Sequence, residues 1–187
     1  QIEESPSIFL DSKTRERMAE DAVKATKAVD YRGVGTIEFL VDKDGKYYFM
    51  EMNTRLQVEH PVSEMVTGID IVKWQIRVAA GIPLAFSQKD VKVFGHAIEC
   101  RINAENPDKN FMPSAGRVTL LHIPGGPWVR FDTALFQDYF VPPFYDSMIG
   151  KLIVHAATRE EAIRKMKASL WIFYLTVNLK TELIPLT

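Results

Sequence analysis

The pattern of apolar and polar residues predicts helices in two regions of the first half of the chain. Apolar residues recur at helical spacing over residues 12–29, and either Asp11 or Ser12 can accept hydrogen bonds from the free N–H groups of a first turn. A second helix is predicted over residues 70–80, because Gly81 directly follows it. Between them, runs of β-branched and aromatic residues predict two strands, residues 34–41 and 46–53.

After residue 88 the pattern changes to short strand-like runs separated by turns rich in Pro and Gly. A last helix is predicted to begin at Thr158, since Thr158 and Glu161 have the spacing of a capping box. We place a domain boundary at this change, with one domain over residues 1–88 and a second over residues 89–187. The apolar run that opens residues 171–187 fits neither an amphipathic helix nor a solvated end. The strands expected in the second domain are residues 95–102, 116–123, 128–132 and 148–156.

Composition narrows the class of protein. The chain has 187 residues, 47% hydrophobic and 25% charged, which is typical of a globular protein and excludes a collagen or a coiled coil. The net charge of −1 argues against nucleic-acid binding by phosphate neutralisation. No apolar run approaches the roughly 18–20 residues of a membrane helix. The single Cys100 excludes an internal disulfide and indicates a reducing compartment. Because the chain starts at Gln1 without an initiator Met or a signal peptide, we expect a longer parent protein.

The candidate chemistry begins at a predicted hairpin. Asp44 and Gly45 stand between the two strands, and this dipeptide is the strongest short hairpin signal. If these two residues form the loop, Glu38 lies directly opposite Glu51, with Cβ atoms roughly 4.5–5.5 Å apart on one face. Three explanations of the facing carboxylates remain open: one holds a proton, both face water, or a cation lies between them.

The neighbours of this pair indicate a lined cleft. Leu40, Phe49 and Asn53 are expected on the same face as the carboxylates. Oxygen donors suit a hard cation such as Mg²⁺ or Mn²⁺ better than zinc. The alternative is a solvated face on which two charges happen to oppose each other.

Polar side chains continue at alternate positions beyond the strand. If the backbone stays extended there, they share one side. Arg55 could then bind an anion such as a carboxylate, and Glu59 could act as a general base. An edge strand with a wet face is the alternative. The residues of this polar row are Glu51, Asn53, Arg55, Gln57 and Glu59.

Four stretches of the chain carry a resemblance to a known family. Residues 51–65 (EMNTRLQVEHPVSEM) resemble the signature of biotin carboxylases, members of the ATP-grasp superfamily, and residues 35–40, 96–105 and 145–152 agree with it. The resemblance implies an α+β fold, with the carboxyl-terminal half of an ATP-grasp domain followed by an incomplete biotin carboxylase C-terminal domain with a mainly antiparallel sheet. The form of residues 51–65 is most similar to the acyl-CoA carboxylase branch, in particular the bacterial acetyl-CoA carboxylase subunit.

The resemblance also implies a reaction and its partners. In this family, ATP and bicarbonate form carboxyphosphate, whose carbon passes to a ureido nitrogen of biotin on the biotin carboxyl carrier protein. This is the first half-reaction of acetyl-CoA carboxylase in fatty acid synthesis, and a carboxyltransferase completes it. A homodimer in the parent enzyme and a cytoplasmic location follow, or a mitochondrial one for a eukaryotic acyl-CoA carboxylase. Because the family's glycine-rich flap and phosphate-binding lysines have no counterpart here, we expect little turnover from the chain alone.

By the same resemblance, Glu38 and Glu51 hold two Mg²⁺ or Mn²⁺ ions that bridge the ATP phosphates. Asn53 assists them, and Leu40 contacts the nucleotide base. These assignments agree with the hairpin register obtained from the Asp-Gly turn.

The remaining implied roles concern bicarbonate and biotin. Arg55 binds bicarbonate together with Gln57 and the backbone of Val58, and Glu59 removes the bicarbonate proton. Arg101 stabilises the enolate-like oxygen of biotin as its ureido proton leaves.

Two other functions remain open. One is a different ATP-grasp ligase that joins a carboxylate to an amine, which would keep the acidic pair but not the bicarbonate and biotin residues. The other is a non-catalytic binding or dimerisation module. Cys100 is interpreted as a small buried residue rather than a nucleophile. The histidines lack metal-ligand spacing and are interpreted as structural: His60, His96, His122 and His155.

Overall fold

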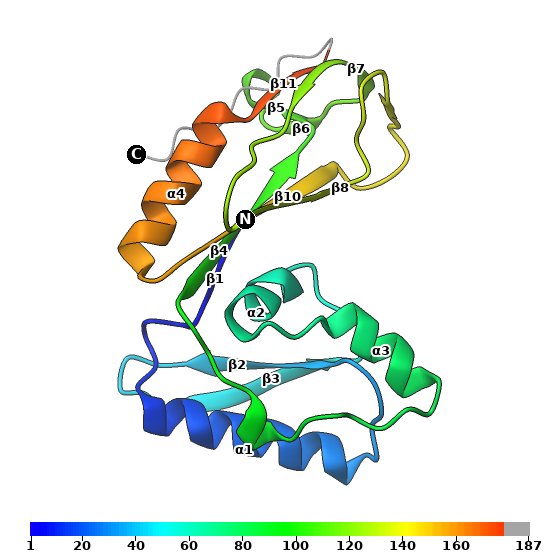
Figure 1. Ribbon diagram of the computed structural model, residues 1–187. Helices are drawn as coiled ribbons and strands as arrows, with labels where there is room; N and C mark the ends of the chain where they lie inside the picture. Colours follow the sequence, from blue (N-terminus) through cyan, green and yellow to red (C-terminus); the bar gives the residue numbers. More distant parts are fainter. Residues whose placement is uncertain (178–187) are drawn as a thin grey trace. The chain divides into compact units, whose positions relative to one another are not determined.

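The structure, a computed structural model, describes residues 1–177 and divides into two compact units. The amino-terminal unit is Pro6–Val93, and the carboxyl-terminal unit combines Gln1–Ser5 with the chain from Phe94. The elements in chain order are β1 (Ile2–Ser5), α1 (Ser12–Ala28), β2 (Thr36–Val41), β3 (Tyr47–Asn53), α2 (His60–Thr67), α3 (Ile71–Ala79), a 3₁₀ turn (Gln88–Asp90), β4 (His96–Asn103), β5 (Glu105–Asn106), a second 3₁₀ turn (Pro107–Lys109), β6 (Met112–Pro113), β7 (Gly116–His122), β8 (Val129–Thr133), β9 (Phe140–Val141), β10 (Met148–Ala156), α4 (Arg159–Ile172) and β11 (Tyr174–Val177) (Figure 1).

In the amino-terminal unit, α1 packs on one face of the β2–β3 hairpin. The side chain of Asp11 accepts the Thr14 N–H at 2.8 Å, so α1 begins where the sequence predicts. On one face α1 holds the hairpin through Tyr47, whose hydroxyl donates to Asp21 at 2.7 Å. Figure 1 shows α2 on the opposite side of the hairpin from α1. The face that α1 leaves open is the one that carries the predicted acidic pair.

Two consecutive helices follow the hairpin. α3 confirms the helix predicted over residues 70–80, and Asp70 caps it by accepting the Lys73 N–H at 2.7 Å. α2 is a helix that the sequence analysis did not predict. It begins at His60, has Pro61 in its first turn, and ends at Gly68, which adopts a left-handed φ of 70°.

The carboxyl-terminal unit is built on an antiparallel sheet of order β1-β4-β10-β8. The four strands expected from the sequence are present as β4, β7, β8 and β10. β1 was not predicted, and its residues fall within the first domain by the sequence-based boundaries. In the structure Ile2 pairs with Cys100, and Ser5 with Ala97. A four-residue strand shows almost no periodicity, so only its distant partner reveals it.

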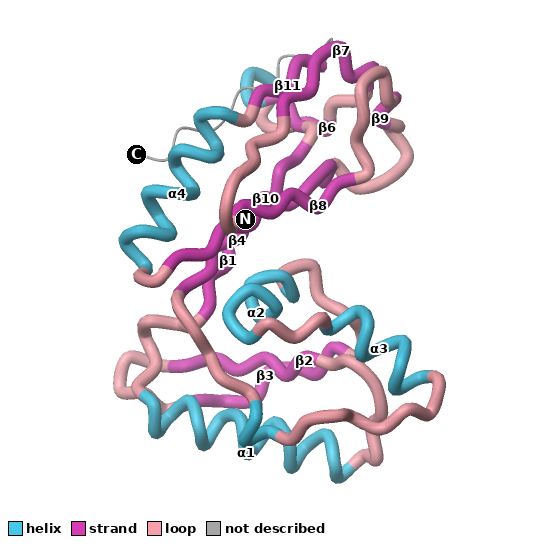
Figure 2. Tube along the Cα trace, in the orientation of Figure 1, coloured by secondary structure: helices cyan, strands magenta, loops and turns pink. Residues whose placement is uncertain are grey.

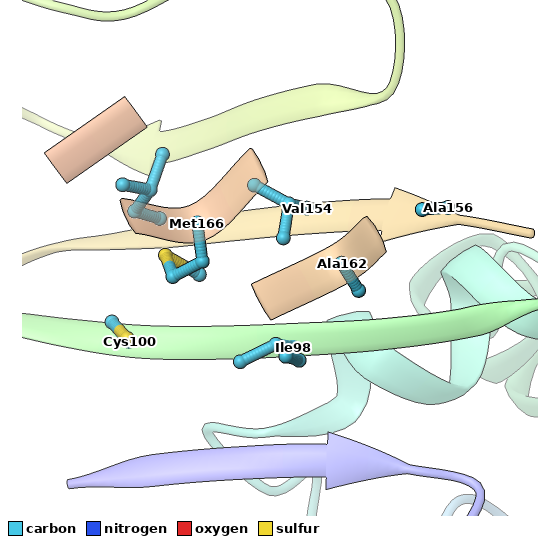
Figure 3. Close-up of a cluster of buried hydrophobic side chains, with 7 residues drawn as sticks. Ile98, Cys100, Val154, Ala156, Ala162 and Met166 are labelled. Carbon is cyan, nitrogen blue, oxygen red and sulfur yellow. The ribbon is translucent and has the colours of Figure 1, made fainter. Parts of the chain in front are cut away.

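Alternation along β4 and β10 produces the core of this unit. Side chains from one face of both strands point toward α4, as Figure 3 shows for Ile98 and Cys100 on β4 and Val154 on β10. Thr158 and Glu161 form the predicted capping box at the start of α4. The fully packed cluster consists of Ile98, Cys100, Leu152, Val154, Ala156, Ala162 and Met166.

A second sheet, of order β11-β7-β9, lies in the same unit. In the run that the sequence left unassigned, residues 171 and 172 end α4 and residues 174–177 form β11, which pairs antiparallel with β7. Residues 178–187 lie outside the described part of the chain. The fold is therefore α+β with antiparallel sheets, as expected. Within residues 1–177, no helix has the length and apolar character needed to cross a membrane.

Candidate functional site

The hairpin register confirms the predicted pairing of the two glutamates. Glu38 on β2 is directly opposite Glu51 on β3, and Thr36 is opposite Asn53. Directly opposed residues of an antiparallel pair project from the same face. Both carboxylates therefore lie together at one end of the hairpin.

The predicted two-residue loop is wrong, although the pairing of the glutamates is correct. The N–H of Asp42 donates to the carbonyl of Lys46 at 2.9 Å, so residues 43–45 form a three-residue loop. The Asp42 carboxylate favours this loop because it accepts the N–H groups of Asp44 and Lys46, each at 2.9 Å. Gly45 supplies the left-handed position with a φ of 77°.

A β-bulge offsets the extra loop residue. The register shifts by one between Glu38 and Phe39, after which Phe39 faces Phe49 and Leu40 faces Tyr48. Phe49 consequently packs against Phe39, with ring centroids 6.5 Å apart, and is not on the acidic face. Its predicted place beside Leu40 is taken by Tyr48. Leu40, on the acidic face two residues after Glu38, is 60% exposed.

One amide holds the two carboxylates together. The Nδ2 atom of Asn53 donates to Oε1 of Glu38 and to Oε1 of Glu51, at 2.8 Å in each case. Because both oxygens lie on the same nitrogen, their separation is at most twice that distance. The structure thus brings together all three residues that the sequence proposed as metal ligands.

A second amide continues this network toward a cation. The Nε2 atom of Gln57 donates to the same Oε1 of Glu38 at 3.0 Å, and its Oε1 accepts from Arg55 at 2.6 Å. The guanidinium of Arg55 also reaches the Leu56 carbonyl at 3.3 Å. Gln57 therefore links the acidic pair directly to the predicted anion-binding arginine.

The expected extended row does not persist beyond the strand. β3 ends at Asn53, and residues 54–59 form an irregular turn (Figure 2). Glu59 is the N-cap residue of α2, and its carbonyl accepts the Val62 N–H at 3.2 Å. Pro61 explains the change, because its ring fixes φ and favours the first turn of a helix. Gln57 is therefore placed by its hydrogen bond to Glu38, and Arg55 by its hydrogen bond to Gln57, whereas the prediction relied on strand alternation.

The predicted biotin residue lies in the other unit. Arg101 is on β4, on the sheet face opposite the cluster of Ile98 and Cys100, and its side chain is 19% exposed. Its guanidinium lies 3.5 Å from the carboxylate of Glu3 on β1. The role of Arg101 in stabilising the enolate-like oxygen of biotin stays a prediction.

The oxygen atoms of Glu38, Glu51 and Asn53 suit a hard divalent cation whose remaining ligands are water or phosphate oxygens. Within residues 1–177, no group of three or more His, Cys, Asp or Glu could hold a metal ion. Two carboxylates meet here with amide groups as their donors. A turn of the Asn53 amide about its last bond would present Oδ1 instead of Nδ2. Mg²⁺ accepts few protein oxygens and completes its shell with water and phosphate oxygens, so these residues fit a metal–nucleotide complex.

Two buried polar residues beneath the turn were not among the predicted site residues. His60 Nδ1 lies 2.7 Å from the Gln57 carbonyl oxygen, and His60 Nε2 lies 3.9 Å from the Glu64 carboxylate. Their side chains are only 11% and 9% exposed. The sequence signal was the spacing of four residues in the first turns of a helix, which was not recognised because that helix was not predicted.

Cys100 behaves as the sequence analysis expects. It is buried, and burial, together with the neighbouring Glu99 charge, raises the pKa of its thiol to about 11. A thiol that remains protonated at neutral pH is a poor nucleophile. Cys100 is therefore a packing residue of the core cluster.

Comparison with known families matches nearly the whole chain. Residues 1–87 match the family model of the ATP-binding domain of the carbamoyl-phosphate synthase L chain. Residues 99–183 match the model of the biotin carboxylase C-terminal domain.

Individual relatives agree with these matches. The chain is 59% identical over 170 residues to biotin carboxylase 1 of Bacillus subtilis, covering 90% of this chain and 38% of the relative. It is 56% identical over 169 residues to a biotin carboxylase of a Nostoc species, covering 90% and 38%. The chain thus spans less than two fifths of the length of these relatives.

Solved structures give the same result. A Campylobacter jejuni biotin carboxylase in complex with β-γ-ATP has a TM-score of 0.90 at 56% identity, covering 94% of this chain and 39% of that one. The biotin carboxylase domain of the Hydrogenobacter thermophilus 2-oxoglutarate carboxylase, with MgADP and bicarbonate, has a TM-score of 0.92 at 47% identity, covering 96% and 39%. Taken with the two domain matches, these similarities show that the chain belongs to the biotin carboxylase family.

Proposed function

We propose that this chain supplies the metal–nucleotide and bicarbonate contacts of a biotin carboxylase, an ATP-dependent ligase. One observation carries the proposal: Gln57 bonds to the acidic carboxylate Glu38 with one atom and to Arg55 with another. An acidic site for cations and a basic site for an anion are thereby adjacent. A reaction between ATP and bicarbonate requires that adjacency, because the two reactants must meet in line.

The acidic face would hold the nucleotide. Glu38 and Glu51, with Asn53, would bind Mg²⁺ or Mn²⁺, two ions when ATP is present, and Leu40 would contact the base. The ions would neutralise phosphate charge during transfer. The exposure of Leu40 and the shared amide of Asn53 support these roles.

The turn after β3 would hold bicarbonate. Arg55 would bind the anion with Gln57 and the backbone of Val58, and Glu59 would take its proton. The bicarbonate oxygen would then attack the γ-phosphorus of ATP, ADP would leave, and carboxyphosphate would form. The hydrogen bond from Arg55 to Gln57 supports a guanidinium that is oriented before the anion arrives.

The carboxyl group of carboxyphosphate would pass to the ureido nitrogen of biotin, and the released phosphate would take up the ureido proton. Arg101 would stabilise the oxygen on which charge develops. Biotin would arrive on its carboxyl carrier protein, and a carboxyltransferase would use the product within a parent homodimer. We assign the acyl-CoA class from residues 51–65, with acetyl-CoA and fatty acid synthesis as the first candidate and the cytoplasm as the expected compartment.

A different ATP-grasp ligase would need the acidic pair but not the linked Arg55. A non-catalytic module would need neither. The Glu38–Gln57–Arg55 link favours the carboxylase over both.

The test uses a chimera in which the matched segment of this chain replaces its counterpart in the Bacillus subtilis relative. We expect ATP cleavage that depends on both bicarbonate and biotin. Glu59→Gln should abolish this cleavage and leave MgATP binding within about twofold, because Glu59 would act only on the bicarbonate proton.

Glu16→Gln is the matched control, since Glu16 is an exposed residue of α1 and its substitution removes the same charge. Bicarbonate-dependent turnover in the Glu59→Gln chimera would show that Glu59 is not the base. ATP cleavage that ignores bicarbonate and requires an amine would instead support the other ligase.

A further inference from the structure

We propose that His60 is a positioning residue whose Nδ1–H fixes the turn carrying Gln57, with the Glu64 carboxylate packed beside the other ring nitrogen. This inference rests on the proposed function, since it assigns a cause to the geometry of the bicarbonate site. His60 and Glu64 would touch neither substrate. His60 would act through the Gln57 backbone.

The first step concerns the proton on His60. Its Nδ1 lies 2.7 Å from the carbonyl oxygen of Gln57. A carbonyl oxygen only accepts hydrogen bonds, so Nδ1 must carry the proton and donate it. The backbone N–H of His60 also points to this oxygen, at 3.4 Å. His60, the first residue of α2, therefore contacts the Gln57 carbonyl through both its ring and its backbone N–H.

The second step concerns the other end of the ring. Nε2 of His60 faces a carboxylate oxygen of Glu64 at 3.9 Å, one helical turn further along α2. The second oxygen of Glu64 accepts the backbone N–H of Ile71 at 2.8 Å. That N–H is one of the free donors of the first turn of α3. At 3.9 Å this is a close approach and not a hydrogen bond, so Glu64 fixes the start of α3 beside the imidazole.

The third step connects His60 to the site. The side chain of Gln57 contacts Glu38 and Arg55, while its carbonyl contacts His60. Gln57 is therefore fixed by its backbone and by both ends of its amide. Because residues 54–59 form an irregular turn outside any strand ladder, these side-chain contacts replace the backbone bonds that hold a strand.

The side chains of His60 and Glu64 are largely shielded from water. Their exposed fractions are 11% and 9%, so water competes weakly for their hydrogen bonds. Asparagine can place an amide N–H near the position of Nδ1, whereas glutamine places its amide near Nε2. This difference gives a matched pair of substitutions.

The first experiment examines the chain itself. We expect long-range ¹H–¹⁵N NMR spectra to show His60 protonated at Nδ1, which is the less common tautomer of free neutral histidine. This measurement needs no variant and no activity. A neutral His60 protonated only at Nε2 would overturn the proposal.

The second experiment measures kinetics in the Bacillus subtilis chimera. His60→Gln should raise the KM for bicarbonate about tenfold, as expected when one orienting hydrogen bond is lost. The KM for MgATP should change by less than about twofold. His60→Asn should recover most of the bicarbonate KM, because it retains the donor to Gln57.

Three results distinguish a failure of the positioning role from a failure of the proposed function. Equal effects of His60→Gln and His60→Asn would overturn the positioning role, as would parallel rises in both KM values. A chimera that never uses bicarbonate, even with His60 present, would overturn the proposed function instead. The NMR result still tests the geometry in that case.

Discussion

Replacing Asn53 by Asp should convert the shared amide into a third carboxylate and make the hairpin depend on a divalent cation. The side chains have nearly the same shape, so packing is preserved. In the structure the Asn53 amide donates to Glu38 and Glu51, each at 2.8 Å. Asp would lose both hydrogen bonds and place its own charge beside two others.

The magnitude follows from these contacts. Each lost hydrogen bond costs about 0.5–1.5 kcal/mol. Each new repulsion, at about 4 Å and with the screening of water, adds about 1 kcal/mol. We use the screening of water because Glu51 is exposed. Asn53→Asp should therefore destabilise the metal-free hairpin by about 3–5 kcal/mol. Asn53→Ala loses the bonds without adding charge, so it should cost about 1–3 kcal/mol.

Hydrogen exchange measured by mass spectrometry on peptides from β2 and β3 reports this local stability without assuming that both units unfold together. In EDTA, Asn53→Asp should lower amide protection by at least about a hundredfold. Mg²⁺ at ten times its dissociation constant should restore about 1.4 kcal/mol. At matched ionic strength, Mg²⁺ should affect Asn53→Ala much less.

Two results would refute the reasoning. If Asn53→Asp is as stable as Asn53→Ala in EDTA, the three side chains do not share one small volume. If Mg²⁺ protects the hairpin of Asn53→Asp no more than that of Asn53→Ala, the volume does not bind a divalent ion.

Three further predictions concern the carboxyl-terminal unit. Gly95→Ala should destabilise it by at least about 3 kcal/mol in urea unfolding, because Gly95 has a φ of 66° and an added methyl would clash with β10. The control is Gly68→Ala in the amino-terminal unit, where the φ of 70° lies in open space and the cost to that unit should be about 1–2 kcal/mol. The hydrogen bond from Arg159 lowers the pKa of Glu4. Glu4 should therefore stabilise the fold above the usual glutamate pKa and lose that effect as the pH falls through the lowered value. The unfolding free energies of the native chain and of Glu4→Gln should then converge in acid. Since the pKa of Cys100 is raised to about 11, a thiol reagent at pH 8 should label the native chain at least about a hundredfold more slowly than the urea-unfolded chain, and equal rates would contradict its burial.

Short-range sequence patterns predict much of the secondary structure. The capping residues of α1, α3 and α4 act on N–H groups within three positions of themselves, so residue type and spacing suffice to locate these helix starts. The pairing of Glu38 with Glu51 was also predictable. The Asp-Gly turn explains it only in part, because a longer loop and a bulge offset each other.

Other features depend on partners that no local window contains. β1 is defined by pairing with β4, which lies more than ninety residues later. The start of α2 at His60 changed an expected extended row into a turn. In that turn the side chain of Gln57 reaches Glu38 on the neighbouring strand.

The sequence by itself determined the acidic pair, the α+β class and the family resemblance, because short-range spacing and an uninterrupted motif encode them. The tertiary structure decided how the polar side chains are connected. Asn53 joins two carboxylates across a hairpin, and His60 at the start of α2 bonds to the Gln57 carbonyl. These links depend on directed hydrogen bonds in three dimensions, for which residue order alone gives no geometry.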